Sequence, residues 1–207
     1  MIELIQALKK ELDGNLPGEI IQLELAPTFR LNIKPGNNKT DAGVLLLLYP
    51  DANNEICIAF IKRTSYDGHH SGQISFPGGK YELCDYSFEK TALRESFEEI
   101  GVIPEEIKII GKLTELYIPV SSFLVHPYVG YINSEPVFRI DESEVEYIIE
   151  GKLKHLVRLP IVTEVFSDDK YQFTAPCFKL NNEIIWGATS MILNEFIHLV
   201  KKTGYYK

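Results

Sequence analysis

The chain has 207 residues, of which 45% are hydrophobic and 24% charged, as in soluble globular proteins. This composition excludes disordered, collagen-like and low-complexity proteins, and the length predicts one domain. The 21 Lys and Arg residues against 29 Asp and Glu residues give a net charge of -8. A protein that binds nucleic acid through phosphate contacts needs a basic surface, so we expect no nucleic-acid partner.

The apolar runs of the chain are too short to cross a membrane. The longest, residues 44–49 and 56–61, have the length of strands, whereas a membrane helix needs about 20 apolar residues. Residues 1–12 mix charged and apolar positions, which predicts an amphipathic helix rather than a secretory signal. We therefore expect a cytoplasmic protein without a membrane partner.

The predicted elements alternate between strands and helices. Beyond the first helix, an irregular segment is expected over residues 26–40, because it is rich in Pro, Gly and Asn. The elements expected after it are a hairpin over 43–49 and 55–61, a glycine-rich loop over 68–79, a helix after Asp85 to about Ile100, strands over 108–117 and 124–131, a short acidic helix over 141–150, a strand near 156–166, a hairpin over 171–185 and a last helix over 189–201.

Strands mixed with few helices predict an α/β (α+β) sandwich around one mixed sheet. We expect an N-terminal helix and irregular segment over 1–41 and the main domain over 42–207. The three cysteines, Cys57, Cys84 and Cys177, form no Cys-x-x-Cys pair, so free thiols are expected rather than disulfides or a zinc site. Cys57 lies within an apolar strand pattern and is expected in the core.

The helix near residues 86–100 carries three glutamates on one face, Glu95, Glu98 and Glu99. The opposite face is predicted to be anchored by three apolar residues: Leu93, Phe97 and Ile100. A solvated acidic face is one interpretation. However, carboxylates four residues apart on a helix repel each other unless a positive charge lies between them. A hard cation such as Mg²⁺, which prefers oxygen ligands, would supply that charge beside the glycine-rich loop.

This segment resembles the signature of the Nudix hydrolases, Gly-x5-Glu-x7-Arg-Glu-U-x-Glu-Glu-x-Gly-U, where U is a bulky apolar residue. The matching residues occur in the same order: Gly79, Asp85, Arg94-Glu95, Glu98-Glu99 and Gly101-Val102. Three features depart from the signature. An Asp stands at the first Glu position, the next spacing is one residue longer, and Ser96 replaces the first bulky residue.

The flanking sequence resembles the coenzyme A pyrophosphatase branch of the family, which also shows this Asp and this longer spacing. The resemblance spans about residues 42–200 and includes Arg63-Thr64 and the segments 70–79, 91–95, 125–130 and 185–189. It implies a Nudix-type α/β/α sandwich. It also implies cleavage of the diphosphate of coenzyme A or acyl-coenzyme A to 3′,5′-ADP and (acyl-)4′-phosphopantetheine.

Gly68 and Thr64 depart from the pattern of that branch, so two other hypotheses stay open. One is a Nudix hydrolase of another nucleoside diphosphate-linked substrate, such as ADP-ribose, a nucleotide sugar, a dinucleotide or a nucleoside triphosphate. The other is a Nudix-fold ligand sensor that has lost catalysis.

The resemblance also implies roles for individual residues. Mg²⁺ or Mn²⁺ would be held by the carboxylates of Glu95, Glu98 and Glu99 and by the carbonyl of Gly79. Glu98 is a further ligand or the base for the attacking water, and the residues expected to be catalytic are Glu98, Glu99 and Arg94. Arg94 is expected to pair with Asp85 to orient the loop, supported by Gly78, although an unpaired surface arginine is the alternative.

Further residues are expected to contact a small nucleotide diphosphate substrate: Arg63, His70, Gln73 and Phe76. Arg63 suits phosphate because a planar guanidinium can bind it bidentately. Weaker candidates are His69, an additional acid among Glu142, Glu144 and Glu146, and base-stacking by Tyr81, Tyr117 or Tyr128. Trp186 is expected to pack in the core or an interface. The apolar stripe of the last helix predicts core packing or a homodimer contact.

Overall fold

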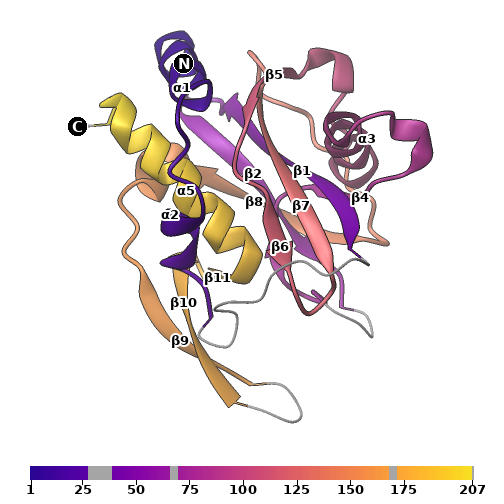
Figure 1. Ribbon diagram of the computed structural model, residues 1–207. Coiled ribbons are helices and arrows are strands. Elements are labelled where there is room, and N and C mark those ends of the chain that lie inside the picture. Colours follow the sequence, from indigo (N-terminus) through magenta and orange to yellow (C-terminus); the bar gives the residue numbers. More distant parts are fainter. Residues whose placement is uncertain (28–38, 66–69, 168–171, 207) are drawn as a thin grey trace.

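A computed structural model describes residues 1–27, 39–65, 70–167 and 172–206 of the chain (Figure 1). Gly68, His69, residue 171 and most of the expected irregular segment lie outside the described residues. The helices are Ile2–Leu12 (α1), Glu19–Leu23 (α2), Phe88–Ile100 (α3), Leu153–Leu156 (α4) and Gly187–Thr203 (α5), with 3-10 turns at Leu83–Asp85 (η2) and Pro104–Glu106 (η3). The strands are Thr40–Pro50 (β1), Ile56–Arg63 (β2), Ile74–Ser75 (β3), Gly78–Lys80 (β4), Lys108–Lys112 (β5), Leu116–Ile118 (β6), Phe123–Tyr131 (β7), Val145–Lys152 (β8), Val162–Ser167 (β9), Gln172–Leu180 (β10) and Glu183–Trp186 (β11).

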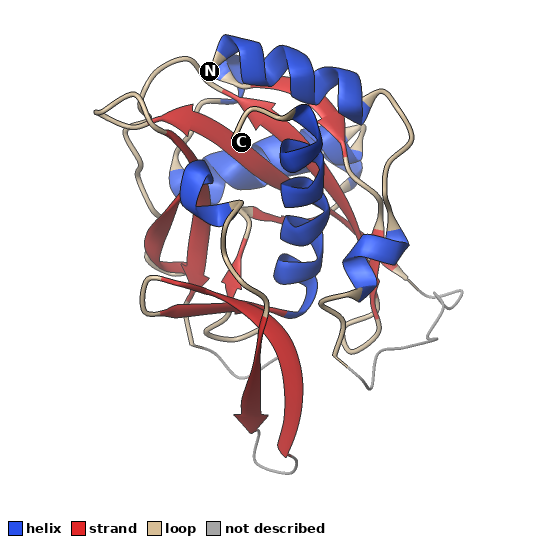
Figure 2. Ribbon diagram, turned by 90° about the vertical axis from the view of Figure 1, so that its left-hand side faces the viewer, coloured by secondary structure: helices blue, strands red, loops and turns tan. Residues whose placement is uncertain are grey.

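Strand β1 organises the larger, mixed sheet. It runs parallel to β7 and antiparallel to β2, and the order along the sheet is β3-β2-β1-β7-β5. Strand β4 also pairs with β1, β6 with β7, and β8 with β2. A second sheet has the order β11-β10-β9 and extends away from the larger sheet (Figure 2).

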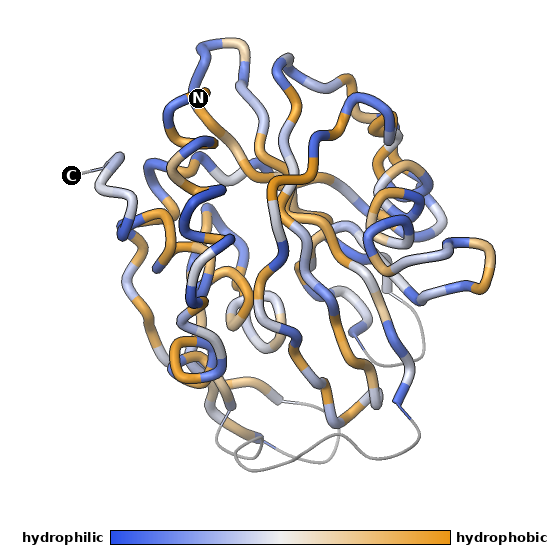
Figure 3. Tube along the Cα trace, turned by 45° about the horizontal axis from the view of Figure 1, so that its top comes forward, coloured by the Kyte–Doolittle hydropathy of each residue, from blue (hydrophilic) through white to orange (hydrophobic). Residues whose placement is uncertain are grey.

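The run of leucines in β1 is buried on both faces of the sheet. Leu45, Leu47 and Tyr49 pack in a cluster with the apolar residues of α3. Leu46 and Leu48 face the opposite side and pack with α1 and α5. A strand that is covered on both faces has no polar alternation, which explains its continuous apolar sequence. Helices therefore cover both faces of the sheet, which confirms the predicted sandwich, and the central strands are mostly hydrophobic (Figures 1 and 3).

The prediction of an acidic helix over 141–150 is wrong, because most of this segment forms strand β8 along β2. Val145 and Ile149 are four residues apart, a spacing that fits one face of a helix and one face of a strand equally. Pairing with β2 decides between the two. It also places Glu150 where the hydroxyl of Tyr49 donates to its carboxylate at 2.8 Å.

Two further strand predictions need correction. The run expected over 108–117 is two strands, β5 and β6, which both pair with β7. The run expected from 156 begins only at Val162, because the short helix α4 precedes it. The two hairpins, the helix α3 and the last helix are confirmed. Cys57 is buried as expected, and all three cysteines are free thiols.

The N-terminal helices pack against α5, where Glu195 joins three separate parts of the chain. Its carboxylate accepts hydrogen bonds from the Gly18 N–H at 3.2 Å and the Gln22 amide at 2.9 Å. It also accepts from the Thr114 hydroxyl at 2.6 Å and from the Thr114 N–H. These bonds connect α2, the loop after β5 and α5. Among the helices of the described segments, none is long and apolar enough to span a bilayer.

Candidate active site

Helix α3 carries the three glutamates and lies close against β1 and β4. The Ser87 hydroxyl caps its first turn by accepting from the Lys90 N–H, and Gly101 ends it in the left-handed region at φ 73°. Gly43 of β1 allows the close approach, since a Cβ there would lie 2.3 Å from the Phe88 carbonyl oxygen. Ser87 and Gly101 therefore set the ends of this helix, and Gly43 lets it pack closely on β1.

The face that α3 presents to the sheet differs from the predicted one at Phe97. This side chain is 50% exposed, although Leu93 and Ile100 are buried as expected. The small residues Ala92 and Ser96 lie against the sheet instead. Their size lets the helix backbone approach closely, which turns Phe97 outward and brings Glu99 into the interior.

The glycines of β4 hold the two inner glutamates. The Gly78 N–H donates to Glu99 Oε2 at 2.7 Å, and Gly78 itself has φ 146°. A Cβ on Gly79 would lie 2.5 Å from the Glu95 carboxylate, so the backbone of Gly79 is in direct contact with that group. Only residues without side chains allow both contacts.

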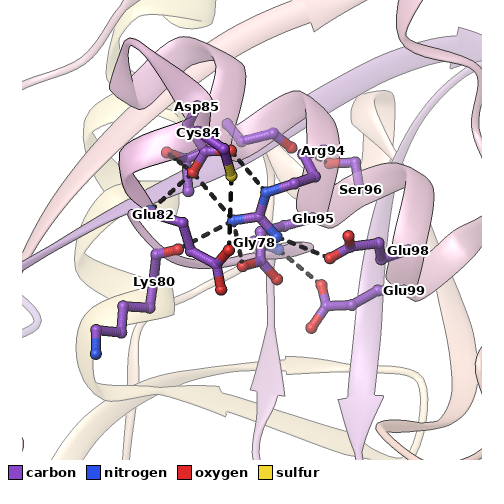
Figure 4. A network of polar contacts seen from close by, with 12 residues as sticks. Gly78, Lys80, Glu82, Cys84, Asp85, Arg94, Glu95, Ser96, Glu98 and Glu99 are labelled. Atoms are coloured by element: carbon purple, nitrogen blue, oxygen red, sulfur yellow. Dashed lines mark hydrogen bonds and ion pairs between the residues drawn. The ribbon is translucent and has the colours of Figure 1, made fainter.

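Arg94 is surrounded by three carboxylates (Figure 4). The expected pair with Asp85 forms, with Nε 2.6 Å from Oδ1. The same guanidinium lies 3.0 Å from Glu95 and 2.8 Å from Glu98, and it donates to the Lys80 carbonyl at 3.1 Å. Its hydrogen bond lowers the pKa of Asp85 to about 2. Arg94 thus ties the loop before α3 to the acidic face of the helix.

Arg63 pairs with the innermost glutamate. The pairing of β2 with β8 shifts its register between Lys62 and Arg63, at the end of β2, and Arg63 Nη1 lies 3.0 Å from Glu99 Oε1. A second, longer contact of 3.9 Å joins Arg63 to the exposed carboxylate of Glu144. Glu99 is only 1% exposed, and burial raises its pKa to about 7. Burial also raises the pKa of Glu95.

A cavity of about 410 Å³ has Arg63 and Gly78, the two partners of Glu99, in its wall, whereas Glu95, Glu98 and Glu99 are not among its lining residues. All four residues expected to contact substrate line it: Arg63, His70, Gln73 and Phe76. His70 bridges two polar residues of the lining, with Nδ1 3.2 Å from Gln73 Oε1 and Nε2 3.0 Å from Ser121 Oγ. Phe76 is buried and packs on Phe60 with ring centroids 5.0 Å apart.

Other parts of the cavity wall were missed by the sequence prediction. Lys80, Ser121 and the first turns of α5, through Ala188, Thr189 and Ile192, also line it. The segment 185–189 had been matched to the family branch, and this match was the available signal for α5.

Several weaker candidates lie elsewhere. Trp186 packs against Phe166 and Phe173 on the second sheet, with ring centroids 4.5 and 5.7 Å apart. Among the described residues, the cavity lining includes neither Trp186 nor any of the three tyrosines considered, Tyr81, Tyr117 and Tyr128. Glu142, Glu144 and Glu146 are all exposed, and Glu144 has a contact with the site, at 3.9 Å from Arg63. Glu98 pairs with Arg94 outside the cavity lining, and its side chain is 55% exposed.

The donor set of this site fits a hard divalent cation. Two neighbouring carboxylates with raised pKa values lie against a glycine backbone, and a cation would favour their charged forms. Across the residues that the structure describes, no three histidine, cysteine, aspartate or glutamate side chains are arranged around one metal position. Instead, Arg63 forms an ion pair with Glu99, and Arg94 forms one with Glu95.

Comparison with known proteins agrees with this geometry. A sequence model of the NUDIX domain matches residues 39–159. The chain is 30% identical over 177 residues to the uncharacterized Nudix hydrolase NudL of Pectobacterium atrosepticum, covering 84% of this chain and 88% of that protein. It is 28% identical to the mitochondrial coenzyme A diphosphatase NUDT8 of Homo sapiens, covering 86% of this chain and 75% of that protein.

The fold also resembles a solved structure. The crystal structure of the Nudix hydrolase RenU from M. smegmatis superposes with a TM-score of 0.55 at 12% identity, covering 86% of this chain and 94% of that one. The fold and the acidic helix with its glycine loop define a diphosphate hydrolase. The chain belongs to the Nudix family, whose members act on small nucleotide diphosphates and generally use divalent metals.

Proposed function

We propose that the protein hydrolyses the diphosphate of coenzyme A or acyl-coenzyme A to 3′,5′-ADP and (acyl-)4′-phosphopantetheine. The observation that carries this proposal is the cavity beside Glu99, because its wall is built from the 70–79 segment that resembles the coenzyme A branch. The similarity to NUDT8, which is named a coenzyme A diphosphatase, supports the same substrate.

The lining of the cavity suits a substrate with one charged part and one uncharged part. Arg63 and Lys80 supply positive charge for a diphosphate, and a guanidinium can bind two phosphate oxygens at once. Much of the remaining wall is apolar: Val44, Ile74, Ile118, Phe123, Val125 and Ile192. An apolar wall favours the uncharged pantetheine arm over a second sugar.

Glu95 and Glu99 would hold Mg²⁺ or Mn²⁺, with Glu98 and the Gly79 carbonyl as further oxygen donors. Such a cation would neutralise charge on the diphosphate and lower the pKa of the attacking water. Arg94 holds Glu95 and Glu98 in place, and Asp85 holds Arg94. Water adds to one phosphorus, the bridging P–O bond breaks, and two phosphate monoester groups form, with release of two protons when both groups are fully ionised.

Product analysis tests this function. The purified protein is incubated with Mg²⁺ or Mn²⁺ and a panel of coenzyme A, acetyl-coenzyme A, ADP-ribose, a dinucleotide and nucleoside triphosphates, and the products are separated by chromatography. Glu99→Gln removes the buried carboxylate. Glu89→Gln is the matched control, because it changes the same residue type in the first turn of the same helix, whereas the contacts with Arg63 and Gly78 belong to Glu99.

We expect 3′,5′-ADP from coenzyme A with the parent protein and with Glu89→Gln, and none with Glu99→Gln. Faster cleavage of ADP-ribose or another panel member would leave a Nudix hydrolase with a different substrate. No cleavage of any member with either metal would contradict the proposal and favour a ligand sensor.

A further inference from the structure

Arg63 forms an ion pair with Glu99, the most deeply buried of the proposed metal ligands. Its Nη1 lies 3.0 Å from Glu99 Oε1, while the Gly78 N–H takes Oε2 at 2.7 Å. Both oxygens of this buried side chain are therefore bonded within the protein. A divalent cation at Glu99 would lie next to the guanidinium, and two positive charges at that distance repel strongly in a buried site.

The side chain of Arg63 can also reach the cavity proposed for the substrate. It is 22% exposed at the side chain and lines the cavity, so the guanidinium lies between the glutamate and the space proposed for the substrate. The backbone is held independently, because the Arg63 N–H donates to the Gln73 carbonyl at 3.0 Å. Its other carboxylate contact, with Glu144 at 3.9 Å, is long and exposed. The side chain can thus change partners while the strand stays in place.

We propose that Arg63 is an internal counter-ion that competes with the divalent cation for Glu99 and moves to the diphosphate when substrate binds. This inference rests on the proposed function for the identity of the anion. Without substrate, Arg63 weakens metal binding. With substrate, the guanidinium leaves Glu99 for the phosphate oxygens, and the cation takes its place. Metal and substrate then bind cooperatively, and the coupling is reciprocal.

Direct titration with Mn²⁺ in the absence of substrate tests the competition. The dissociation constant is measured by calorimetry or by the spin-resonance signal of free Mn²⁺ for the parent protein, Arg63→Gln, Arg63→Lys and Lys62→Gln. Lys62 is the matched control: it is the adjacent residue and carries the same charge, but it pairs with Glu183 at 3.2 Å. Thermal unfolding checks that each variant is folded.

We expect Arg63→Gln to bind Mn²⁺ about tenfold more tightly than the parent, because a charge-assisted hydrogen bond no longer opposes the cation. Lys62→Gln should stay within about twofold of the parent, because its charge pairs with Glu183 rather than with the site. Arg63→Lys should lie between, since it keeps the charge without the planar fork. If Arg63→Gln does not fold, a Mn²⁺ dissociation constant of Arg63→Lys that equals that of the parent overturns the proposal.

Substrate binding by Arg63→Gln should weaken, whereas its Mn²⁺ binding should become tighter. The KM for coenzyme A should rise by about tenfold in Arg63→Gln, since the phosphate loses a partner. General damage to the site would instead weaken metal and substrate binding together. Mn²⁺ binding by Arg63→Gln that is no tighter than that of the parent or of Lys62→Gln overturns the inference. If the parent binds Mn²⁺ but cleaves no coenzyme A, the proposed function fails, while the Mn²⁺ comparison still decides the role of Arg63.

Discussion

Two helices of this protein each bury a glutamate, and the surroundings of the two side chains differ. Glu195 of α5 is fully buried, and the donors to its carboxylate among the described residues are neutral: two backbone N–H groups, a hydroxyl and an amide. Glu99 of α3 is 1% exposed, and it accepts from one N–H and from the guanidinium of Arg63 beside a cavity.

The comparison shows how a buried carboxylate can be structural or reactive. Neutral donors from two segments, at α2 and after β5, satisfy the hydrogen-bonding capacity of the Glu195 carboxylate, so we expect it to keep these partners. Glu99 has one neutral donor, the Gly78 N–H, and one cationic partner, the partly exposed Arg63, and burial raises its pKa to about 7. A carboxylate of the second kind can exchange one cation for another. Substitutions at the two sites should therefore have opposite effects on activity and on stability.

The largest effect is expected for Glu99→Gln. Hydrolysis should fall by at least about a hundredfold, the scale found when one group that stabilises transition-state charge is removed. The free energy of unfolding should change by less than about 1 kcal/mol, because Arg63 stays partly solvated. Steady-state kinetics and urea denaturation measure the two quantities. Activity near that of the parent would show that Glu99 is another structural carboxylate.

Glu195→Gln should show the reverse pattern. The glutamine places an NH₂ group among the donors of Gly18, Gln22 and Thr114, and each unsatisfied donor costs about 1–3 kcal/mol. We expect a loss of about 2–3 kcal/mol in the free energy of unfolding, with kcat unchanged below the unfolding transition. Loss of kcat without loss of stability would break the contrast with Glu99.

Asp85→Asn should lower the free energy of unfolding by less than Glu195→Gln does, and the decrease should depend on pH. The pKa of Asp85 is lowered from 3.8 to about 2 by Arg94, so its charge stabilises the folded state above about pH 4 and that contribution is lost as the pH falls toward 2. At pH 7 the variant should be about 1–2 kcal/mol less stable than the parent. Denaturation curves recorded from pH 7 downward should show the two proteins converging. A constant difference would mean that the charge of Asp85 is not involved.

Phe97→Ala should have the smallest effect, about 1 kcal/mol or less, because half of this ring is already exposed. The matched substitution Leu93→Ala, at a buried position of the same helix, should cost about 2–5 kcal/mol. Equal losses in urea denaturation would show that α3 packs on the face predicted from the helical wheel.

Local signals in the sequence predicted the parts of the fold that depend on neighbouring residues. Glycine and proline turns marked the first hairpin, and apolar periodicity with a terminal glycine marked α3. Strand β8 was misjudged because Val145 and Ile149 fit both periodicities, and only pairing with β2 distinguishes them. Phe97 was misjudged because a helical wheel does not show that Ala92 and Ser96 let the helix approach the sheet.

Some residues of the candidate site could be predicted from local sequence, and others depend on contacts between distant segments. The family signature identified the glutamates, Arg94 and Asp85, which lie close together in the sequence. The contact of Arg63 with Glu99 joins residues 36 positions apart on β2 and α3, and no local pattern encodes it. The contribution of α5 to the cavity likewise depends on how the last helix packs across the sheet.

Mn²⁺ binding by Glu99→Gln and Glu195→Gln, measured side by side with the parent protein, tests the central contrast most directly. We expect Glu195→Gln to bind Mn²⁺ with the dissociation constant of the parent and Glu99→Gln not to bind it detectably. Binding by Glu99→Gln that equals that of the parent, or loss of binding in Glu195→Gln while it is still folded, would contradict the assignment of Glu99 as the metal ligand and of Glu195 as structural.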